Sequence, residues 1–257
     1  MEFDPSQVMG WVAAIIWPFI RVSAMLMAMP VIGSNNVPIR VRLAITLAVT
    51  IVIAPQLSNL PSIDPLSIES WLLVLEQILI GVAMGFALQL VFSAVVIGGQ
   101  VVALQMGLGF ASMVDPSSGM QMPMISQLYM LAVILLFLAF NGHLIIIEMV
   151  ANSFVSLPVG KGFLSSESLW LLINWGGDMF ASGLLVAIPT VGALLIVNIS
   201  FGIMTRASPQ LNIFAIGFPF MIGIGLAVML VTLPTLTSQT QKMFDDIFEL
   251  IRSIIGI

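Results

Sequence analysis

Few side chains in this sequence are able to carry out covalent or acid–base chemistry. His143 is the only histidine, so it has no second histidine with which to share a transition-metal ion, and no cysteine is present to supply a thiolate. Its setting, the Phe-Asn-Gly-His run at 140–143, favours a role in capping a helix turn. Within the apolar tracts, phosphate loops, nucleophile elbows and carboxylate pairs at helical spacing are also absent. The sequence therefore predicts no enzymatic activity, metal site or cofactor.

Among the charged side chains in or beside the apolar tracts of the sequence, five are candidates for a functional or a paired role. An unpaired charge at the centre of a membrane helix costs about 2.5 to 3.5 kcal/mol on insertion scales. These residues could form a proton or ion relay, or they could be paired or placed at helix ends, and we favour the second interpretation. They are Arg21, Glu76, Glu148, Asp178 and Arg206.

The sequence contains six apolar tracts, and these charges lie in them or at their ends. The tracts predict an all-α protein, because a helix satisfies its own backbone hydrogen bonds in an apolar environment. Hydrophobic residues make up 60% of the chain and charged residues 7%, which is too few to cover a water-soluble surface. We therefore expect an integral membrane-complex protein. The tracts are Val8 to Ile32, Ile39 to Ala54, Trp71 to Leu104, Met124 to Val155, Met179 to Met204 and Ile213 to Leu236.

The lengths of these tracts do not suit six simple membrane spans. At 1.5 Å per residue, Ile39 to Ala54 reaches about 24 Å and Trp71 to Leu104 about 50 Å, whereas the apolar core of a bilayer is roughly 30 Å thick. Long, bent helical hairpins are expected instead. The candidate bends are Pro18, the Gly98-Gly99 pair, the Asn141-Gly142 pair, Pro189 and Pro219.

The balance and placement of charge along the chain bear on possible partners. The net charge of −5 argues against nucleic acid as a partner. Basic residues divide three against three between the two expected sides of a membrane, which suggests that partners fix the position of the chain. The last stretch forms an amphipathic helix, expected to dock on a partner or to lie on a membrane interface. Its apolar face carries Met243, Ile247, Leu250 and Ile254.

The stretch Gln105 to Pro123 differs from the apolar tracts on either side of it. Its glycines and prolines exclude a regular helix, yet its methionines make it too apolar for an exposed loop. It could be an apolar plug that closes a pore at rest, or a static connector packed against helices. The plug residues are Met106, Gly107, Leu108, Gly109, Phe110, Met113, Asp115, Pro116, Met120 and Met122.

Two further features suggest contacts between helices. Gly81 and Gly85 lie one turn apart and permit close approach of a second helix, either from another subunit or from the same chain. Arg206, Pro209 and Gln210 form a polar tip between two apolar helices. This tip is expected to face the cytoplasm and to contact a neighbouring subunit.

The sequence resembles the FliR family, the R subunit of the flagellar type III export gate. The order and spacing of several short matches carry the resemblance over nearly the full length. They are Trp17-Pro18 with Arg21, Pro38 with Arg40, Leu104 to Leu108 with Phe110-Ala111 and Asp115-Pro116, Phe140 to His143, and Arg206 with Pro209 to Leu211 and Ile216 to Pro219.

The resemblance implies a division of the chain and a set of partners. Residues 1–175, with the plug loop at 105–123, look like a P-type subunit, and 176–257 look like a Q-type hairpin with an amphipathic extension. Several P-type and Q-type subunits, the switch subunit and the export ATPase machinery would join it.

The resemblance also implies a function. The expected assembly is a pore for unfolded flagellar proteins in the bacterial inner membrane at the flagellar basal body, with part of it on the periplasmic side. Two alternatives remain: the homologous subunit of a virulence injectisome, and a small-solute or ion transporter that uses the buried charges as its site.

Overall fold

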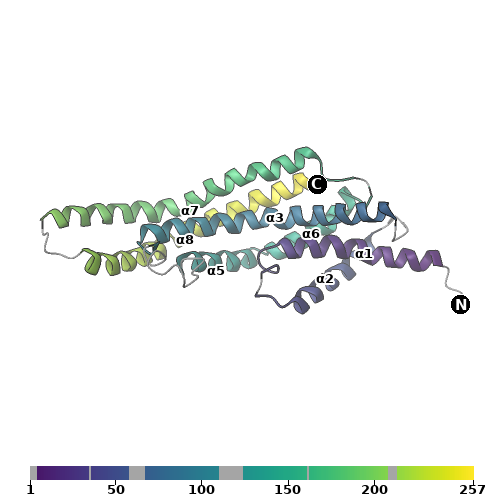
Figure 1. The fold of residues 1–257 in the computed structure, drawn as a ribbon, viewed down its shortest axis with the longest axis horizontal. Helices are drawn as coiled ribbons and strands as arrows, with labels where there is room; N and C mark the ends of the chain where they lie inside the picture. The colour runs from purple at the N-terminus through teal and green to yellow at the C-terminus, as the bar shows by residue number, and fades with distance from the viewer. Residues whose placement is uncertain (1–4, 35, 58–66, 110–123, 161, 208–212) are drawn as a thin grey trace. The chain divides into compact units, whose positions relative to one another are not determined.

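The computed structural model describes residues 5–34, 36–57, 67–109, 124–160, 162–207 and 213–257, with only the backbone at 5–13 and 213–216. Every regular element in these ranges is a helix, as predicted, and Figure 1 traces their order. The helices are α1 (Pro5–Ala28), α2 (Ile39–Ile53), a short 3₁₀ turn η1 (Ala54–Gln56), α3 (Ile68–Gln105), α5 (Met124–Ala139), α6 (Gly142–Ser156), α7 (Ser166–Ala207) and α8 (Ile213–Ile255).

Proline and asparagine set several of the helix ends. Pro38 precedes the first residue of α2. Its carbonyl oxygen accepts hydrogen bonds from the backbone N–H groups of Val41 and Arg42. Asn141 adopts the left-handed region at φ 57°, and the axes of α5 and α6 meet there at 63°. The bend predicted at Asn141-Gly142 is confirmed, whereas the other candidate bends lie inside continuous helices.

The three longest helices confirm the expectation of long helical elements. α3, α7 and α8 contain 38, 42 and 43 residues, or about 57, 63 and 64 Å at 1.5 Å per residue. Each exceeds the roughly 30 Å of a bilayer core. The change in composition after Leu236 predicts an amphipathic helix separate from the preceding apolar tract, but α8 joins the two in one helix.

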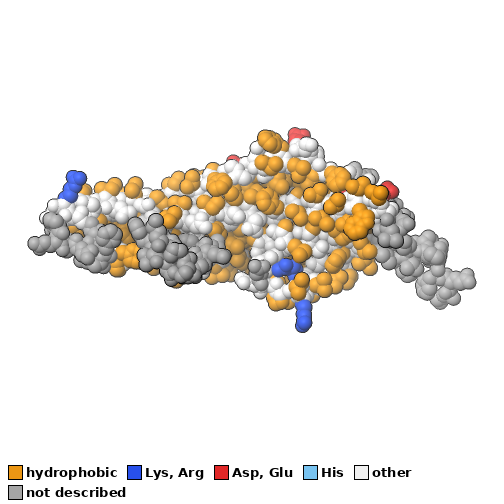
Figure 2. All heavy atoms as spheres, viewed as in Figure 1, with side chains coloured by type: hydrophobic (Ala, Val, Ile, Leu, Met, Phe, Trp, Pro, Cys, Tyr) orange, Lys and Arg blue, Asp and Glu red, His pale blue; other side chains and the backbone are white. Residues whose placement is uncertain are grey.

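Within the described part of the chain, four helical segments are long and apolar enough to cross a membrane, and α5 with α6 would make a fifth if the bent pair were one span. Figure 2 shows orange apolar side chains spread over the visible face, with few red or blue ones among them. A surface of this kind needs lipid or apolar protein around it. The four segments are Ile39–Gln56, Ile68–Gln105, Ser166–Ala207 and Gly217–Ile255.

The chain folds as two compact units. The first contains Met1–Leu90, Asn141–Gly176 and Phe244–Ile257, and the second contains Val91–Phe140 and Gly177–Met243. In the first unit, α2 packs against α1, and α3 lies against α1 around Gly81 and Gly85. In the second unit, Phe92 of α3 meets Phe137 of α5 edge to face, with 5.7 Å between ring centroids.

Candidate functional site

Arg21 is fully buried in the first unit and makes four hydrogen bonds. Its Nε donates to Gln77 Oε1 at 2.8 Å, and one terminal nitrogen donates to both the carbonyl and the hydroxyl of Ser153 at 2.9 Å. The other terminal nitrogen donates to the Leu157 carbonyl at 2.9 Å, and the guanidinium lies 4.0 Å from the Phe154 ring centroid. The cation thus ties α1 to α3 and to the end of α6, whose dipole favours a positive charge there.

Glu76 supplies the negative charge near this guanidinium. Its carboxylate accepts a hydrogen bond from the Gly160 backbone N–H and a long one, 3.5 Å, from the Gln77 amide. Gln77 therefore forms a hydrogen-bonded bridge between Glu76 and Arg21. The opposite charges of the two residues also attract each other. The favoured interpretation, structural pairing, describes these two residues. Gln77 was not singled out in the sequence, although an amide next to a carboxylate inside an apolar tract is a signal that could have identified it.

The other three charges of the predicted set lie elsewhere. Glu148 on α6 and Asp178 on α7 are exposed in the single chain, and Arg206 is exposed in the last turn of α7. The structure does not bring these three to the Arg21 network. Pro209 and Gln210, the rest of the predicted tip, lie outside the described residues.

Gly81 and Gly85 are buried under α1 of the same chain. A Cβ at Gly81 would overlap the Arg21 carbonyl oxygen, and one at Gly85 would lie 2.5 Å from the Met25 carbonyl oxygen. Ala24 and Ala28 face the two glycines, so small residues meet on both helices. The intrachain alternative thus describes this pair, because α1 already occupies the space that a neighbouring subunit would need.

The root of the predicted plug loop has a defined geometry in the second unit. Gly107 adopts φ 84°; its N–H donates to the Leu104 carbonyl, and the Leu108 N–H donates to the Ala103 carbonyl, each at 3.0 Å. This Schellman arrangement ends α3 and requires the left-handed conformation that glycine tolerates best.

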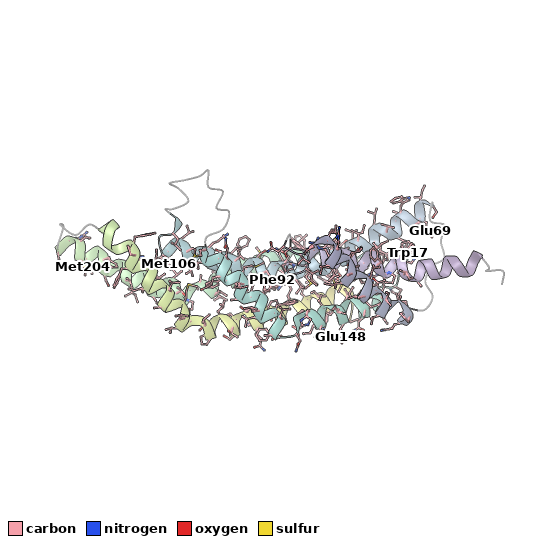
Figure 3. The ribbon with its side chains drawn as sticks, turned by 90° about the horizontal axis from the view of Figure 1, so that it is seen from below. Trp17, Glu69, Phe92, Met106, Glu148 and Met204 are labelled. Carbon is pink, nitrogen blue, oxygen red and sulfur yellow. The ribbon has the colours of Figure 1, made fainter. Side chains whose placement is uncertain are left out.

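Met106, labelled in Figure 3, is buried beside this helix end and rests on Gly225 of α8. A Cβ at Gly225 would lie 2.6 Å from the Met106 methyl carbon, so the glycine forms a notch for the thioether. Met106 therefore acts as an internal anchor in the single chain. The remaining plug candidates after Gly109, namely Phe110, Met113, Asp115, Pro116, Met120 and Met122, lie outside the described residues.

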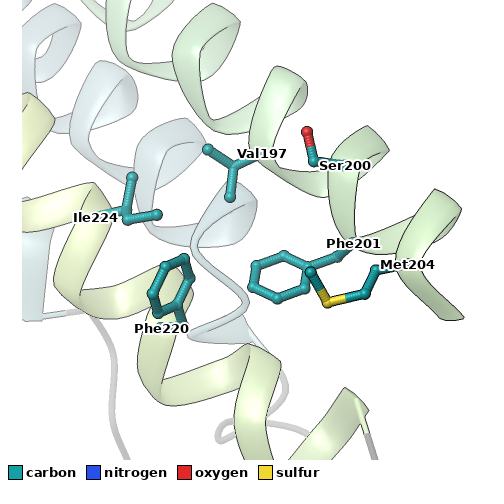
Figure 4. Close-up of a pocket in the computed structure, with 6 residues that line it drawn as sticks. All are labelled: Val197, Ser200, Phe201, Met204, Phe220 and Ile224. Atoms are coloured by element: carbon teal, nitrogen blue, oxygen red, sulfur yellow. The ribbon is translucent and has the colours of Figure 1, made fainter. Parts of the chain in front are cut away.

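An apolar groove opens between α7 and α8 in the second unit (Figure 4). Its volume is about 430 Å³. The Phe201 and Phe220 rings meet edge to face in it, with 5.4 Å between ring centroids. Its lining offers one hydroxyl among hydrocarbon and thioether groups, so it suits an apolar side chain better than a charged solute. The lining residues are Val197, Ser200, Phe201, Met204, Phe220 and Ile224.

The amphipathic end of α8 packs inside the chain, which corrects the expectation of a partner or a membrane interface beneath its apolar face. Met243, at the end of the second unit, is buried, and so are Ile247 and Ile254 in the first unit. The Ile254 carbonyl accepts a hydrogen bond from the Ser168 hydroxyl at 3.3 Å. The charged face, which includes Asp245 and Asp246, is exposed. The physical reason is that the chain's own helices already cover the apolar stripe.

His143 lies in the first turn of α6, but the residue at the cap position is Asn141. Within the described part of the chain, the His143 Nδ1 atom is buried without a hydrogen-bond partner. No group of three histidine, cysteine, aspartate or glutamate side chains suited to a metal ion occurs among the described residues. The arrangement of side chains is thus one of helix packing and buried hydrogen bonding.

Comparisons with known proteins give the family. The model of the bacterial export proteins, family 1, matches residues 12–247. The flagellar biosynthetic protein FliR of Escherichia coli is 37% identical over all of this chain and 98% of its own length. FliR of Pectobacterium carotovorum is 34% identical over 99% of this chain and 97% of its own, and FliR of Aquifex aeolicus is 31% identical over 90% and 89%. The chain belongs to the FliR family of bacterial export proteins.

Proposed function

We propose that this chain is a core subunit of the flagellar type III protein export gate, where it forms, with P-type and Q-type subunits, the pore for unfolded flagellar proteins. The family match makes it a membrane component of the flagellar export apparatus and not an enzyme. The finer assignment adds a location in the bacterial inner membrane, with part of the complex on the periplasmic side. It also includes the switch subunit as a partner and the division into P-like residues 1–175 and Q-like residues 176–257.

The observation that carries the proposal is the unequal burial of the long helices. In its most apolar window, α3 is 67% buried by its own chain, whereas the corresponding windows of α7 and α8 are only 28% and 22% buried. Two helices of more than 40 residues thus present apolar surface far longer than a bilayer core requires. Neighbouring apolar subunits would cover this surface, and the groove of Figure 4 would receive a side chain from one of them.

The transporter alternative has less support. A transport site needs polar groups that are free to form hydrogen bonds with the solute. The strongest candidate, Arg21, already makes four hydrogen bonds within the protein and is 0% exposed. The injectisome alternative is disfavoured because the relatives compared carry flagellar names.

A secretion assay tests the proposal in cells. A strain that lacks its own copy of this chain should export no flagellar hook or filament protein, and expression of the chain should restore export. If the strain still exports these proteins without it, the chain is not a required part of the gate. An unchanged level of a virulence substrate in the same medium would separate the flagellar from the injectisome assignment.

Deletion of Phe110 to Met113 tests the proposed role of the loop as an apolar plug. The long helices carry the packing and the loop carries closure, so the deletion should leave assembly intact and raise ion conductance of the resting gate. Conductance across membranes that contain the assembled variant is the measurement. A wild-type conductance would show that the loop is a connector and that partner subunits provide the seal.

A further inference from the structure

Helix α2 has its polar and apolar faces reversed relative to a helix of a water-soluble protein. The inward face, which packs toward α1, carries Thr46 and Thr50, exposed by 2% and 0%. The outward face carries only aliphatic side chains apart from Arg40 near its beginning. Its large members are Ile39, Val41, Leu43, Leu47, Ile51 and Val52, exposed by 39% to 73%.

The inward polar groups are satisfied inside the chain. The Thr46 and Thr50 hydroxyls donate to the carbonyls one turn earlier, at 2.9 and 2.7 Å. Arg42 donates to the carbonyls of Ile32, Ser34 and Val37, at 3.1, 2.9 and 3.4 Å. Because these bonds leave no inward polar group in need of water, the exposed aliphatic face decides what surrounds α2.

We propose that the outward face of α2 is covered by lipid acyl chains and that Arg40 binds the headgroup of an anionic phospholipid at the beginning of this face. Arg40 is exposed and has no hydrogen-bond partner within the described residues, unlike Arg42 two positions later. Its planar guanidinium can form paired hydrogen bonds with a phosphate group.

The dimensions of the face fit this arrangement. Ile39 to Val52 covers about 20 Å at 1.5 Å per residue, and the hydrocarbon of one leaflet is about 15 Å thick, half of the bilayer core. A headgroup held at Arg40 therefore leaves its acyl chains alongside Leu43, Leu47 and Ile51. Figure 2 shows blue basic side chains next to orange ones in the region where Figure 1 places α2.

The composition of the face favours lipid over a protein partner. Protein interfaces are enriched in aromatic residues and arginine and carry about one hydrogen bond per 100 to 200 Å². The outward face of α2 has no aromatic side chain and no hydrogen-bonding side chain other than Arg40. Ala44 and Ala48 are the two positions on which another helix could pack closely, and they provide a direct discrimination.

Quenching by brominated lipids tests the acyl-chain contact. The chain has no cysteine, so Leu47→Cys can carry a bimane label in the full chain, purified with the subunits that accompany it and placed in vesicles. Phosphatidylcholine with brominated acyl chains should quench this label but not the same label at Asp246→Cys, on the exposed charged face of α8. A Leu47 label as weakly quenched as the Asp246 label would overturn the proposal, because protein would then cover the face.

The headgroup assignment has its own readout. With the label at Leu43→Cys, brominated phosphatidylglycerol should be preferred over brominated phosphatidylcholine by about fivefold, the effect of one basic residue at an anionic surface. Arg40→Gln should reduce the preference to about one, and Arg252→Gln, the same charge change at an exposed position in the last turn of α8, should leave it unchanged. An equal preference in wild type and Arg40→Gln would remove Arg40 from the site.

The substitution Ala48→Leu separates lipid from a helix partner. A fluid lipid accommodates the larger side chain, so the yield of the complex should stay unchanged, whereas a packed helix would be displaced and the yield would fall, which would contradict the proposal. This inference builds on the membrane setting in the proposed function. The same preparations also show whether P-type and Q-type subunits accompany the chain. Failure of the lipid proposal would leave these subunits present, whereas failure of the gate proposal would show as their absence.

Discussion

Replacement of Arg21 by methionine is expected to prevent accumulation of the folded chain. The substitution leaves the Glu76 carboxylate buried without its compensating charge. It also removes the N–H groups that donate hydrogen bonds to the Ser153 and Leu157 carbonyls. Removing one partner of a buried ionic pair costs about 3 to 5 kcal/mol, a large fraction of the stability of a typical domain. Thermal unfolding of the detergent-purified chain, together with its yield from membranes, measures the effect.

Three variants show whether the loss comes from the charge. Glu76→Gln in the Arg21→Met background should recover part of the stability, because it removes the uncompensated charge. The stability of Arg21→Lys should lie between those of wild type and Arg21→Met, because an ammonium group has fewer and differently placed hydrogen-bond donors than a guanidinium. Arg206→Met, at an exposed position, should change stability by about 0.5 kcal/mol or less. Equal losses in the Arg21 and Arg206 variants would contradict the structural role of the network.

Substitution of Gly85 by alanine is expected to separate α1 from α3. The added methyl group would lie 2.5 Å from the Met25 carbonyl oxygen and 2.7 Å from the Ala28 Cβ, and a helix backbone cannot move out of the way cheaply. Overpacking of this kind costs about 1 to 3 kcal/mol and sometimes more. A reduced melting temperature of the purified chain, and a reduced yield of any complex that contains it, are the expected results.

Gly192→Ala is the matched control for this prediction. No atom lies within 4 Å of a Cβ built at Gly192, so the same chemical change meets open space in the middle of α7. Alanine favours a helix over glycine by about 1 kcal/mol, and the variant should be as stable as wild type or slightly more stable. If Gly85→Ala behaved like Gly192→Ala, α1 and α3 would not pack as closely as the structure shows.

The helical content and the break at Asn141-Gly142 could be predicted from the sequence because they depend on local properties: apolar tract length and the turn preference of Asn-Gly. The other candidate bends show the limit of such reasoning. Gly98 and Gly99 lie within α3, where Gly98 contacts Gly183 and Val186 of α7 and Gly99 contacts Ser126 and Tyr129 of α5. A glycine pair signals close approach as well as flexibility, and only the tertiary structure shows which of the two applies.

The candidate site shows the same division. The buried Arg21 was predicted to be paired, and its charge interacts with that of Glu76. The groups that hold it lie far away in the sequence, because Gln77 is 56 positions from Arg21, and Ser153 and Leu157, at the end of α6, are 132 and 136 positions from it. The amphipathic end of α8 was expected to meet a partner because its stripe is visible in the sequence while the helices that cover it are not. Local patterns thus show that a surface is apolar, and the fold decides what covers it.

The mass of the intact complex purified in mild detergent shows whether this chain is a subunit of an export gate. We expect the chain to be recovered with P-type and Q-type export subunits, as one copy among several of each, because neighbouring subunits cover the apolar faces of α7 and α8. Native mass spectrometry of a preparation tagged on this chain measures the composition. Recovery of the chain alone, or only as copies of itself, from membranes that also contain the other subunits would contradict the account.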